Sequence, residues 1–161
     1  MRAVSNTSPL SNLAIIARLD LLKQRYGAVR IPPAVADELS RLSHAAARAR
    51  LDGARNEGWL IVEKLSGPLS PLSSPLDLGE HEAIALALTL RADVLLMDEK
   101  RGRAAARQAG LTVAGVLGEL LYAKHQGTIP ILKVELQRLR TEAGFFIDVG
   151  IEQFILSQGG E

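Results

Sequence analysis

The chain has 161 residues, 47% of them hydrophobic, which is enough for one well-buried core but short for two. Its 19 basic and 18 acidic residues give a formal net charge of +1, which excludes the global positive field of a nucleic-acid packaging protein. The absence of cysteine excludes disulfides and thiolate metal sites and fits a reducing cytosol. We therefore expect one domain spanning residues 1–161, with any nucleic-acid contact confined to a local patch.

No stretch approaches the roughly 18–20 apolar residues that cross a bilayer. Residues 1–22 interrupt their apolar positions with polar side chains, whereas a secretory signal peptide has a basic stretch followed by an unbroken apolar run. We expect a cytoplasmic protein without membrane contact.

Short apolar runs alternate along the chain with longer helical patterns. This alternation predicts an α/β fold, in which a parallel β-sheet is flanked by helices on both faces. Strands are expected at 2–4, 29–31, 59–62, 92–97 and 111–113. Helices are expected at 9–17, 19–26, 33–42, 44–56, 79–90, 98–109, 116–125 and 131–143.

Two segments do not fit this alternation. Residues 66–78 are rich in serine and proline and are expected to form a loop. The apolar segment 145–156 is expected to pack back on the domain. Aromatic residues make up only 4% of the chain, which gives little support for an extensive platform that stacks nucleic-acid bases.

Polar side chains follow two of the apolar strands. Asn6 comes after the first predicted strand and Asp98 after the fourth. Because the binding crevice of an open parallel sheet lies beyond the carboxyl ends of its strands, both would face it if these strands are neighbours. The alternatives are local roles, Asn6 in an Asx-turn or cap and Asp98 as the cap of its own helix.

Acidic residues on two helices could reach the same crevice. Glu38 borders the apolar stripe of its helix, although it could equally be a solvated residue paired with Arg41. Glu80 shares a helix face with apolar side chains, so we prefer it as the inward acid and keep Glu82 in reserve. The alternative for Glu80 is a favourable interaction with the dipole of its helix.

Carboxylates that are held close together repel one another unless cations lie between them. Oxygen ligands suit Mg²⁺ or Mn²⁺, which activate water and stabilise an attacked phosphate. The histidines at 44, 81 and 125 lack the paired spacing of a zinc site. The residues therefore favour hydrolysis at a hard-metal site, although each acid taken singly has a structural explanation.

The predicted helix after Asp98 has a basic face. Lys100, Arg103 and Arg107 recur at three- and four-residue spacing, and Arg101 lies beside them. These residues could form a solvated face, or they could hold the phosphates of a nucleic acid beside the metal site.

Four blocks of the chain resemble, in order, the small prokaryotic PIN-domain proteins, a group that includes VapC-type toxins. They are AVSNTSPLSNLAII, IPPAVADELSR, LDLGEHEAIALAL and ADVLLMDEKRGRAAARQAGLTVAGVLGELLYAKHQGTI. The likeness extends over nearly the whole chain.

The resemblance implies a parallel sheet between layers of helices and Mg²⁺- or Mn²⁺-dependent cleavage of single-stranded or structured RNA. By matching position it implies that the catalytic and metal-binding residues are Asn6, Glu38, Glu80 and Asp98, with Glu82 and Glu99 in reserve. The partners it implies are RNA, an antitoxin-like protein and a second copy of the chain, which the apolar carboxyl-terminal segments could bind.

The chain departs from the family pattern at Asn6, where an aspartate is expected. An amide oxygen can bind a metal but brings no negative charge, so cation binding is weakened. Whether the replacement is natural or introduced, two hypotheses stay open: a ribonuclease, and a weak or inactive module that binds RNA or an antitoxin-like partner. A third is a structural domain whose acids only cap helices, and its melting temperature would not respond to Mn²⁺.

Overall fold

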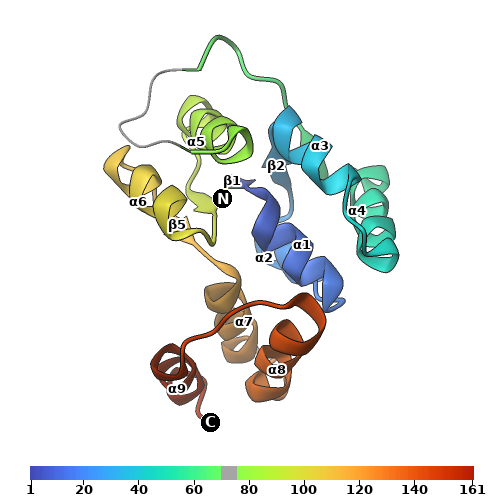
Figure 1. Ribbon diagram of the computed structural model, residues 1–161, viewed down its shortest axis with the longest axis vertical. Helices are drawn as coiled ribbons and strands as arrows, with labels where there is room; N and C mark the ends of the chain where they lie inside the picture. Colours follow the sequence, from blue (N-terminus) through green and yellow to red (C-terminus); the bar gives the residue numbers. More distant parts are fainter. Residues whose placement is uncertain (70–75) are drawn as a thin grey trace.

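The computed structural model describes residues 1–69 and 76–161 (Figure 1). The predicted loop at 66–78 therefore falls partly on residues 70–75, which lie outside the described residues. The helix after this loop begins at Leu78, one residue earlier than expected, because the Asp77 side chain accepts a hydrogen bond from the backbone N–H of Glu80 and caps the first turn.

Five parallel strands form one sheet in the order β3-β2-β1-β4-β5. They are β1 (Ala3–Ser5), β2 (Val29–Ile31), β3 (Leu60–Val62), β4 (Val94–Leu96) and β5 (Val113–Ala114). The central strand β1 pairs with β2 on one side and with β4 on the other. The order of strands reverses between β1 and β4, and such a switch point is where open α/β sheets bind their ligands.

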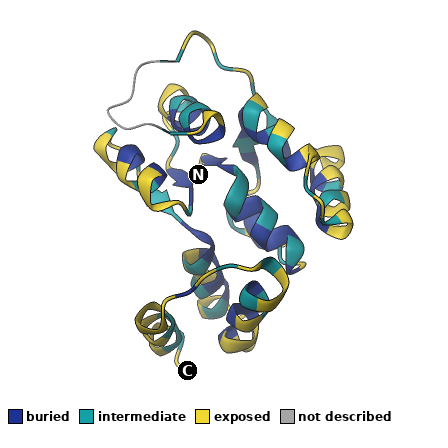
Figure 2. Ribbon diagram, viewed as in Figure 1, coloured by how far each residue is buried: buried dark blue, intermediate teal, exposed yellow. Residues whose placement is uncertain are grey.

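The two faces of the sheet are covered by two separate clusters of buried side chains. Along each strand successive residues point to opposite faces, so Ala3 and Leu96 join one cluster while Val4 and Leu95 join the other. The first face is covered by α1 (Thr7–Ile15), α2 (Asp20–Tyr26), α3 (Pro33–Ser40), α4 (Ala45–Glu57), α7 (Val116–His125) and α8 (Leu132–Ala143). The second is covered by α5 (Leu78–Leu90) and α6 (Lys100–Gln108). This confirms the predicted three-layer α/β/α arrangement (Figures 1 and 2).

The structure shifts two predicted boundaries near the end of the sheet. The backbone N–H of Leu111 donates to the carbonyl of Ala106 at 3.0 Å and closes the turn after α6, so β5 begins at Val113 and not at Leu111. The helix expected from Asp98 begins at Lys100 instead, because Glu99 has extended backbone angles. Asp98 is thereby released from its own helix to make contacts elsewhere.

The carboxyl-terminal segment packs back on the domain only in part. It forms the helix α9 (Val149–Gln158), which contacts α7 and α8, but none of its residues is fully buried. Ile155 and Leu156 lie partly against the core, whereas the apolar side chains of Val149 and Phe154 are exposed to solvent (Figure 2). Within residues 1–69 and 76–161, no helix combines the length and apolar character needed to cross a membrane.

Candidate active site

Asn6 lies directly after β1 and is held beside β4. Its backbone N–H donates to the carbonyl of Leu96 at 2.9 Å. The residue occupies the N-cap position of α1, but its side chain makes no capping hydrogen bond. The side chain is buried, and its Oδ1 has no hydrogen-bond partner among the described residues. The capping explanation for Asn6 is therefore wrong, and its amide oxygen is available to a ligand.

Asp98 follows β4, and its carboxylate accepts hydrogen bonds from residues of α7 and α1. Its Oδ1 accepts a hydrogen bond from the backbone N–H of Val116 at 2.8 Å, at the start of α7, and its Oδ2 accepts one from Ser8 Oγ at 3.3 Å. Burial raises the pKa of the Asp98 carboxyl above its ordinary value, although these hydrogen bonds and the charge of Arg103 oppose the rise. Asp98 does not cap its own helix, so that alternative is also wrong.

Glu38 on α3 is directed at the residue after Asn6. The Thr7 hydroxyl donates a hydrogen bond to Glu38 Oε2. Arg41, the alternative partner, instead forms an ion pair with Asp37 at 2.9 Å. A Cβ atom on Gly79 would stand only 2.5 Å from Glu38 Oε1, so the carboxylate occupies space that a side chain at the start of α5 would need.

Glu80 in the first turn of α5 is 7% exposed, and its Oε2 has no hydrogen-bond partner among the described residues. Burial, followed by the neighbouring Asp77, raises the pKa of Glu80 to about 7. A Cβ on Gly102 of α6 would stand 2.5 Å from Glu80 Oε2, so the carboxylate lies in the gap between α5 and α6. Glu82 is used differently, because its Oε1 accepts from the backbone N–H of Ala34 at 3.1 Å and caps α3.

Asn6 and Asp98 thus follow β1 and β4, Glu38 reaches the start of α1, and Glu80 lies between α5 and α6, without forming a complete ligand cage. In the part of the chain that the structure describes, no three His, Cys, Asp or Glu residues are grouped closely enough to hold a metal ion. Of these four side chains, Asn6 and Glu80 each have a buried oxygen without a hydrogen-bond partner among the described residues, Oδ1 and Oε2 respectively, as do Glu63 and Glu135 elsewhere in the chain. A buried polar atom without a partner costs about 1–3 kcal/mol, which a bound cation or water would recover. The oxygen donors present fit Mg²⁺ or Mn²⁺ in chemistry.

Sequence reasoning missed the residues that hold these acids in place. Thr7 and Ser8 orient Glu38 and Asp98 through their hydroxyls, and Asn12 Nδ2 donates to Ser8 Oγ at 3.0 Å. The available signal was the run of small polar residues after the first strand, which begins a helix without using its side chains as caps.

The basic residues of α6 divide into two groups. Arg103 is half-buried, donates from Nη1 to the carbonyl of Met97 at 3.0 Å, and has its pKa lowered by burial and by the charge of Arg107. Lys100, Arg101 and Arg107 are exposed, as is the reserve acid Glu99. None of the four cations forms an ion pair with a carboxylate in residues 1–69 and 76–161.

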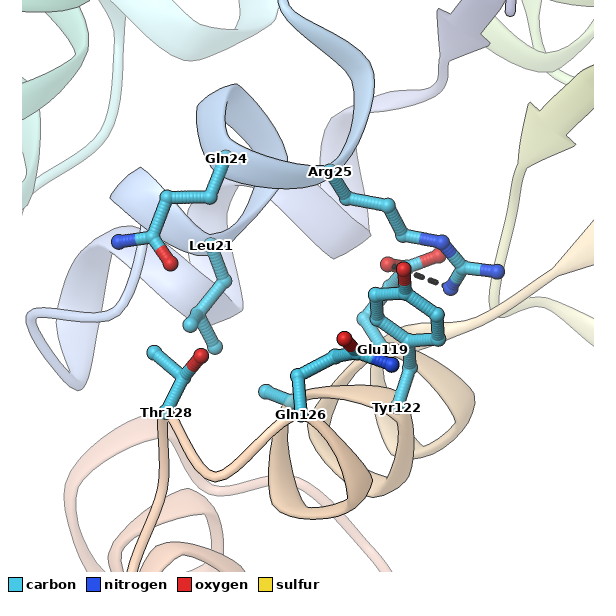
Figure 3. A pocket seen from close by; sticks show the side chains of 8 residues that line it. Leu21, Gln24, Arg25, Glu119, Tyr122, Gln126 and Thr128 are labelled. Atoms are coloured by element: carbon cyan, nitrogen blue, oxygen red, sulfur yellow. Dashed lines mark hydrogen bonds and ion pairs between the residues drawn. The ribbon is translucent and has the colours of Figure 1, made fainter.

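Two cavities among those in the described residues differ in their relation to these acids. One, of about 260 Å³, lies between α2 and α7, where Arg25 covers the ring of Tyr122 at 3.8 Å and forms an ion pair with Glu119 (Figure 3). Its charged groups are paired with each other. The other is a groove of about 640 Å³ that opens at Asp98 and Arg103 and runs toward α9.

Comparison with known proteins identifies the arrangement. A family model described as a PIN domain matches residues 2–161. The fold is similar to that of a PilT N-terminus domain protein from the hyperthermophilic archaeon Sulfolobus solfataricus, with a TM-score of 0.55 and 21% identity over 76% of this chain and 93% of that chain. At this identity the likeness concerns the fold alone. No curated protein sequence matches the chain significantly.

Proposed function

Because the chain belongs to the PIN-domain family, a superfamily of nuclease type, we propose that it is a divalent-metal-dependent ribonuclease that hydrolyses RNA phosphodiester bonds. PIN domains generally use divalent metals. The observation that carries the proposal is the pair of buried, unpartnered oxygens, Asn6 Oδ1 and Glu80 Oε2, beside the switch point of the sheet. Unsatisfied oxygens in a buried site indicate a missing ligand.

In this proposal Mg²⁺ or Mn²⁺ is held by oxygens from the sheet edge and from two helices. The residues are Asn6, Glu38, Glu80 and Asp98. When bound, the ion lowers the pKa of a coordinated water and neutralises charge on the phosphate. Glu82 is a poor reserve ligand because it already caps α3, whereas the exposed Glu99 makes no capping bond.

The protein's own groups set the geometry around this cluster. The hydroxyls of Thr7 and Ser8 fix the orientations of Glu38 and Asp98, as hydrogen-bonded neighbours of metal ligands commonly do. Arg103 lies beside Asp98 without an ion pair to it, so its guanidinium can contact a phosphate oxygen. The exposed Lys100, Arg101 and Arg107 supply positive charge along the approach.

The neutral amide of Asn6 favours a second candidate function. With three carboxylates instead of four, the cluster repels a phosphate less strongly and holds a cation less tightly. A catalytically weak or inactive module would still bind RNA or an antitoxin-like protein. A toxin role and a homodimer formed through the apolar carboxyl-terminal segments are further extensions of the proposal.

The test is cleavage of a fluorescent single-stranded RNA by the purified protein in Mg²⁺ or Mn²⁺, with EDTA as the blank. We expect Asn6→Asp to raise the rate and Asp98→Ala to abolish it. The matched control is Asp93→Ala, at the opposite end of β4, where the carboxylate accepts only from the backbone N–H of Arg2. Cleavage that survives Asp98→Ala would refute the site. RNA binding without any cleavage, independent of metal and of Asp98, would establish the second candidate.

A further inference from the structure

All three phenylalanines of the chain line the groove that opens at Asp98. Phe145, Phe146 and Phe154 come from the segment before α9 and from α9 itself. Asp98 and Arg103, from other elements of the fold, line the same groove. The volume, about 640 Å³, lies within the range of roughly 300–1,000 Å³ that is typical of small-ligand sites. Half of the six aromatic residues of this chain therefore line one groove together with a proposed catalytic group.

The rings of Phe146 and Phe154 do not contribute to the hydrophobic core. Phe145 packs against the main core, whereas the side chains of Phe146 and Phe154 are 85% and 61% exposed. The guanidinium–ring contacts in the described part of the chain are those of Arg25 with two tyrosines, so no cation covers either ring. Exposed aromatic rings that line a groove indicate a binding surface, because single apolar residues elsewhere on a surface do not cluster in this way.

The side chains along the groove are complementary to a ligand that has an anionic backbone and an attached aromatic group. Arg103 lines the groove near Asp98, and Arg107 is close enough to lower its pKa. The second carboxylate of the groove, Asp148, is occupied because its Oδ1 accepts hydrogen bonds from the backbone at the start of α9. The groove is therefore lined by a cation from α6 and by free ring faces from α9 and the segment before it. A nucleotide has this division, with its phosphate as the anion and its base as the flat ring.

We propose that Phe146 and Phe154 form a stacking subsite for an unpaired RNA base, while the adjoining backbone passes Arg103 and Asp98. The inference rests on the proposed ribonuclease function and narrows its substrate to RNA that is single-stranded next to the cleaved bond. Bases in a duplex already stack on their neighbours, so aromatic side chains bind unpaired bases. The low aromatic content gave little support for an extensive base-stacking platform, whereas this subsite accommodates only one or two bases.

The experiment measures binding of a fluorescein-labelled oligoadenylate of about ten nucleotides, a length typical of single-strand sites, by anisotropy in EDTA so that no cleavage occurs. The variants are Phe146→Ala, Phe146→Leu, Phe146→Trp and Phe154→Ala. Val149→Ala is the matched control, because Val149 is an exposed apolar residue of α9 that does not line the groove. A duplex of the same length is the second probe.

We expect the alanine and leucine variants to bind the single strand roughly tenfold more weakly. Phe146→Trp and Val149→Ala should bind it like the wild type, and duplex binding should be the same for all. Equal affinity of every variant for the single strand, or equal losses on the duplex, would overturn the proposal. So would full RNA binding by Phe154→Ala together with conversion of a wild-type dimer to a monomer, because the groove would then accommodate a second copy of the chain.

The two proposals can fail separately. Weaker single-strand binding by the phenylalanine variants, in a protein that cleaves no RNA, would support the stacking subsite and refute the ribonuclease. Cleavage that requires Asp98 but is unchanged in kcat and KM by the phenylalanine variants would refute the subsite alone.

Discussion

Two buried glutamates differ in how the fold treats them. Glu119 on α7 is 2% exposed, and both of its oxygens are paired. Tyr26 Oη donates to Oε1 at 2.5 Å. Arg25 Nη1 donates to Oε2 at 3.0 Å (Figure 3). Glu80 on α5 is 7% exposed, and its Oε2 has no partner among the described residues. A buried charge with a full set of partners ties two helices together, whereas one without them marks a place for a ligand.

The same contrast separates structure from candidate chemistry in the rest of the molecule. Glu135 on α8 is as deeply buried as Glu119, and its Oε1 accepts from Arg18 at 2.6 Å, while its Oε2 has no hydrogen bond within residues 1–69 and 76–161 but lies 3.6 Å from the guanidinium of Arg138. Glu119 connects α7 to Arg25 of α2, and Glu135 connects α8 to Arg18, which precedes α2. The acids near the end of β4 have hydroxyl and glycine neighbours, and the one cation described beside them, Arg103, forms no ion pair with Asp98. Burial alone therefore does not identify a functional carboxylate, but the identity of its partners does.

The largest expected effect tests the structural role of the fully paired Glu119. Glu119→Ala removes the anion between Arg25 and Tyr26 and should lower the free energy of unfolding by about 3 kcal/mol. For a chain of this size the melting temperature should fall by roughly 6–12 °C. The control Glu142→Ala, which removes an exposed partner of Arg138, should cost less than about 1 kcal/mol. Equal melting temperatures of the two variants would break the comparison.

A somewhat smaller effect tests whether Glu80 binds a metal ion. Mn²⁺ at about a hundred times its dissociation constant should stabilise the wild type by about 2.7 kcal/mol, because it binds only the folded state. Glu80→Gln should abolish most of this gain without lowering the metal-free melting temperature, since the amide removes an unpaired buried charge. Glu119→Ala should keep the gain. A full response to Mn²⁺ in Glu80→Gln would show that Glu80 is not a metal ligand.

A third effect, on the pH dependence of stability, tests the burial of Glu80. Burial raises the pKa of Glu80 from 4.5 to about 7, so the folded protein binds the proton more tightly than the unfolded chain does. The stability from this group is complete below pH 4.5 and is lost as the pH rises to about 7. In EDTA, the melting temperature of the wild type should therefore fall relative to Glu80→Gln across this interval. A constant difference between the two proteins would contradict the assigned burial.

Much of the sheet edge could be predicted because its signals are local. A short apolar run followed by a polar residue predicts a strand end, and parallel pairing then brings Asn6 and Asp98 to one edge. Helical spacing distinguished the inward Glu80 from Glu82 for the same reason. That Glu82 caps α3, by contrast, could not be predicted, because this bond joins helices that are distant in sequence.

Features that depend on packing between distant helices escaped sequence reasoning. Nothing near Glu119 in the sequence indicates that α2 brings Arg25 and Tyr26 to it. The overall aromatic content likewise gave no sign that the phenylalanines would share one groove with Asp98. Composition reports how many side chains of a type exist, and only the path of the chain decides whether they meet.

The central position of β1 has a consequence for the order of events on the ribosome. Among the five strands of this sheet β1 is synthesised before the others, yet one of its two neighbours is β4, so the N–H of Asn6 has no bond to the carbonyl of Leu96 until β4 is made. Pairing across so long a separation is slow, and domains complete their folding as their last elements emerge. A nascent chain that ends before β4 lacks Asp98 and the pairing that places it beside Asn6, so the candidate site cannot assemble until β4 has been synthesised.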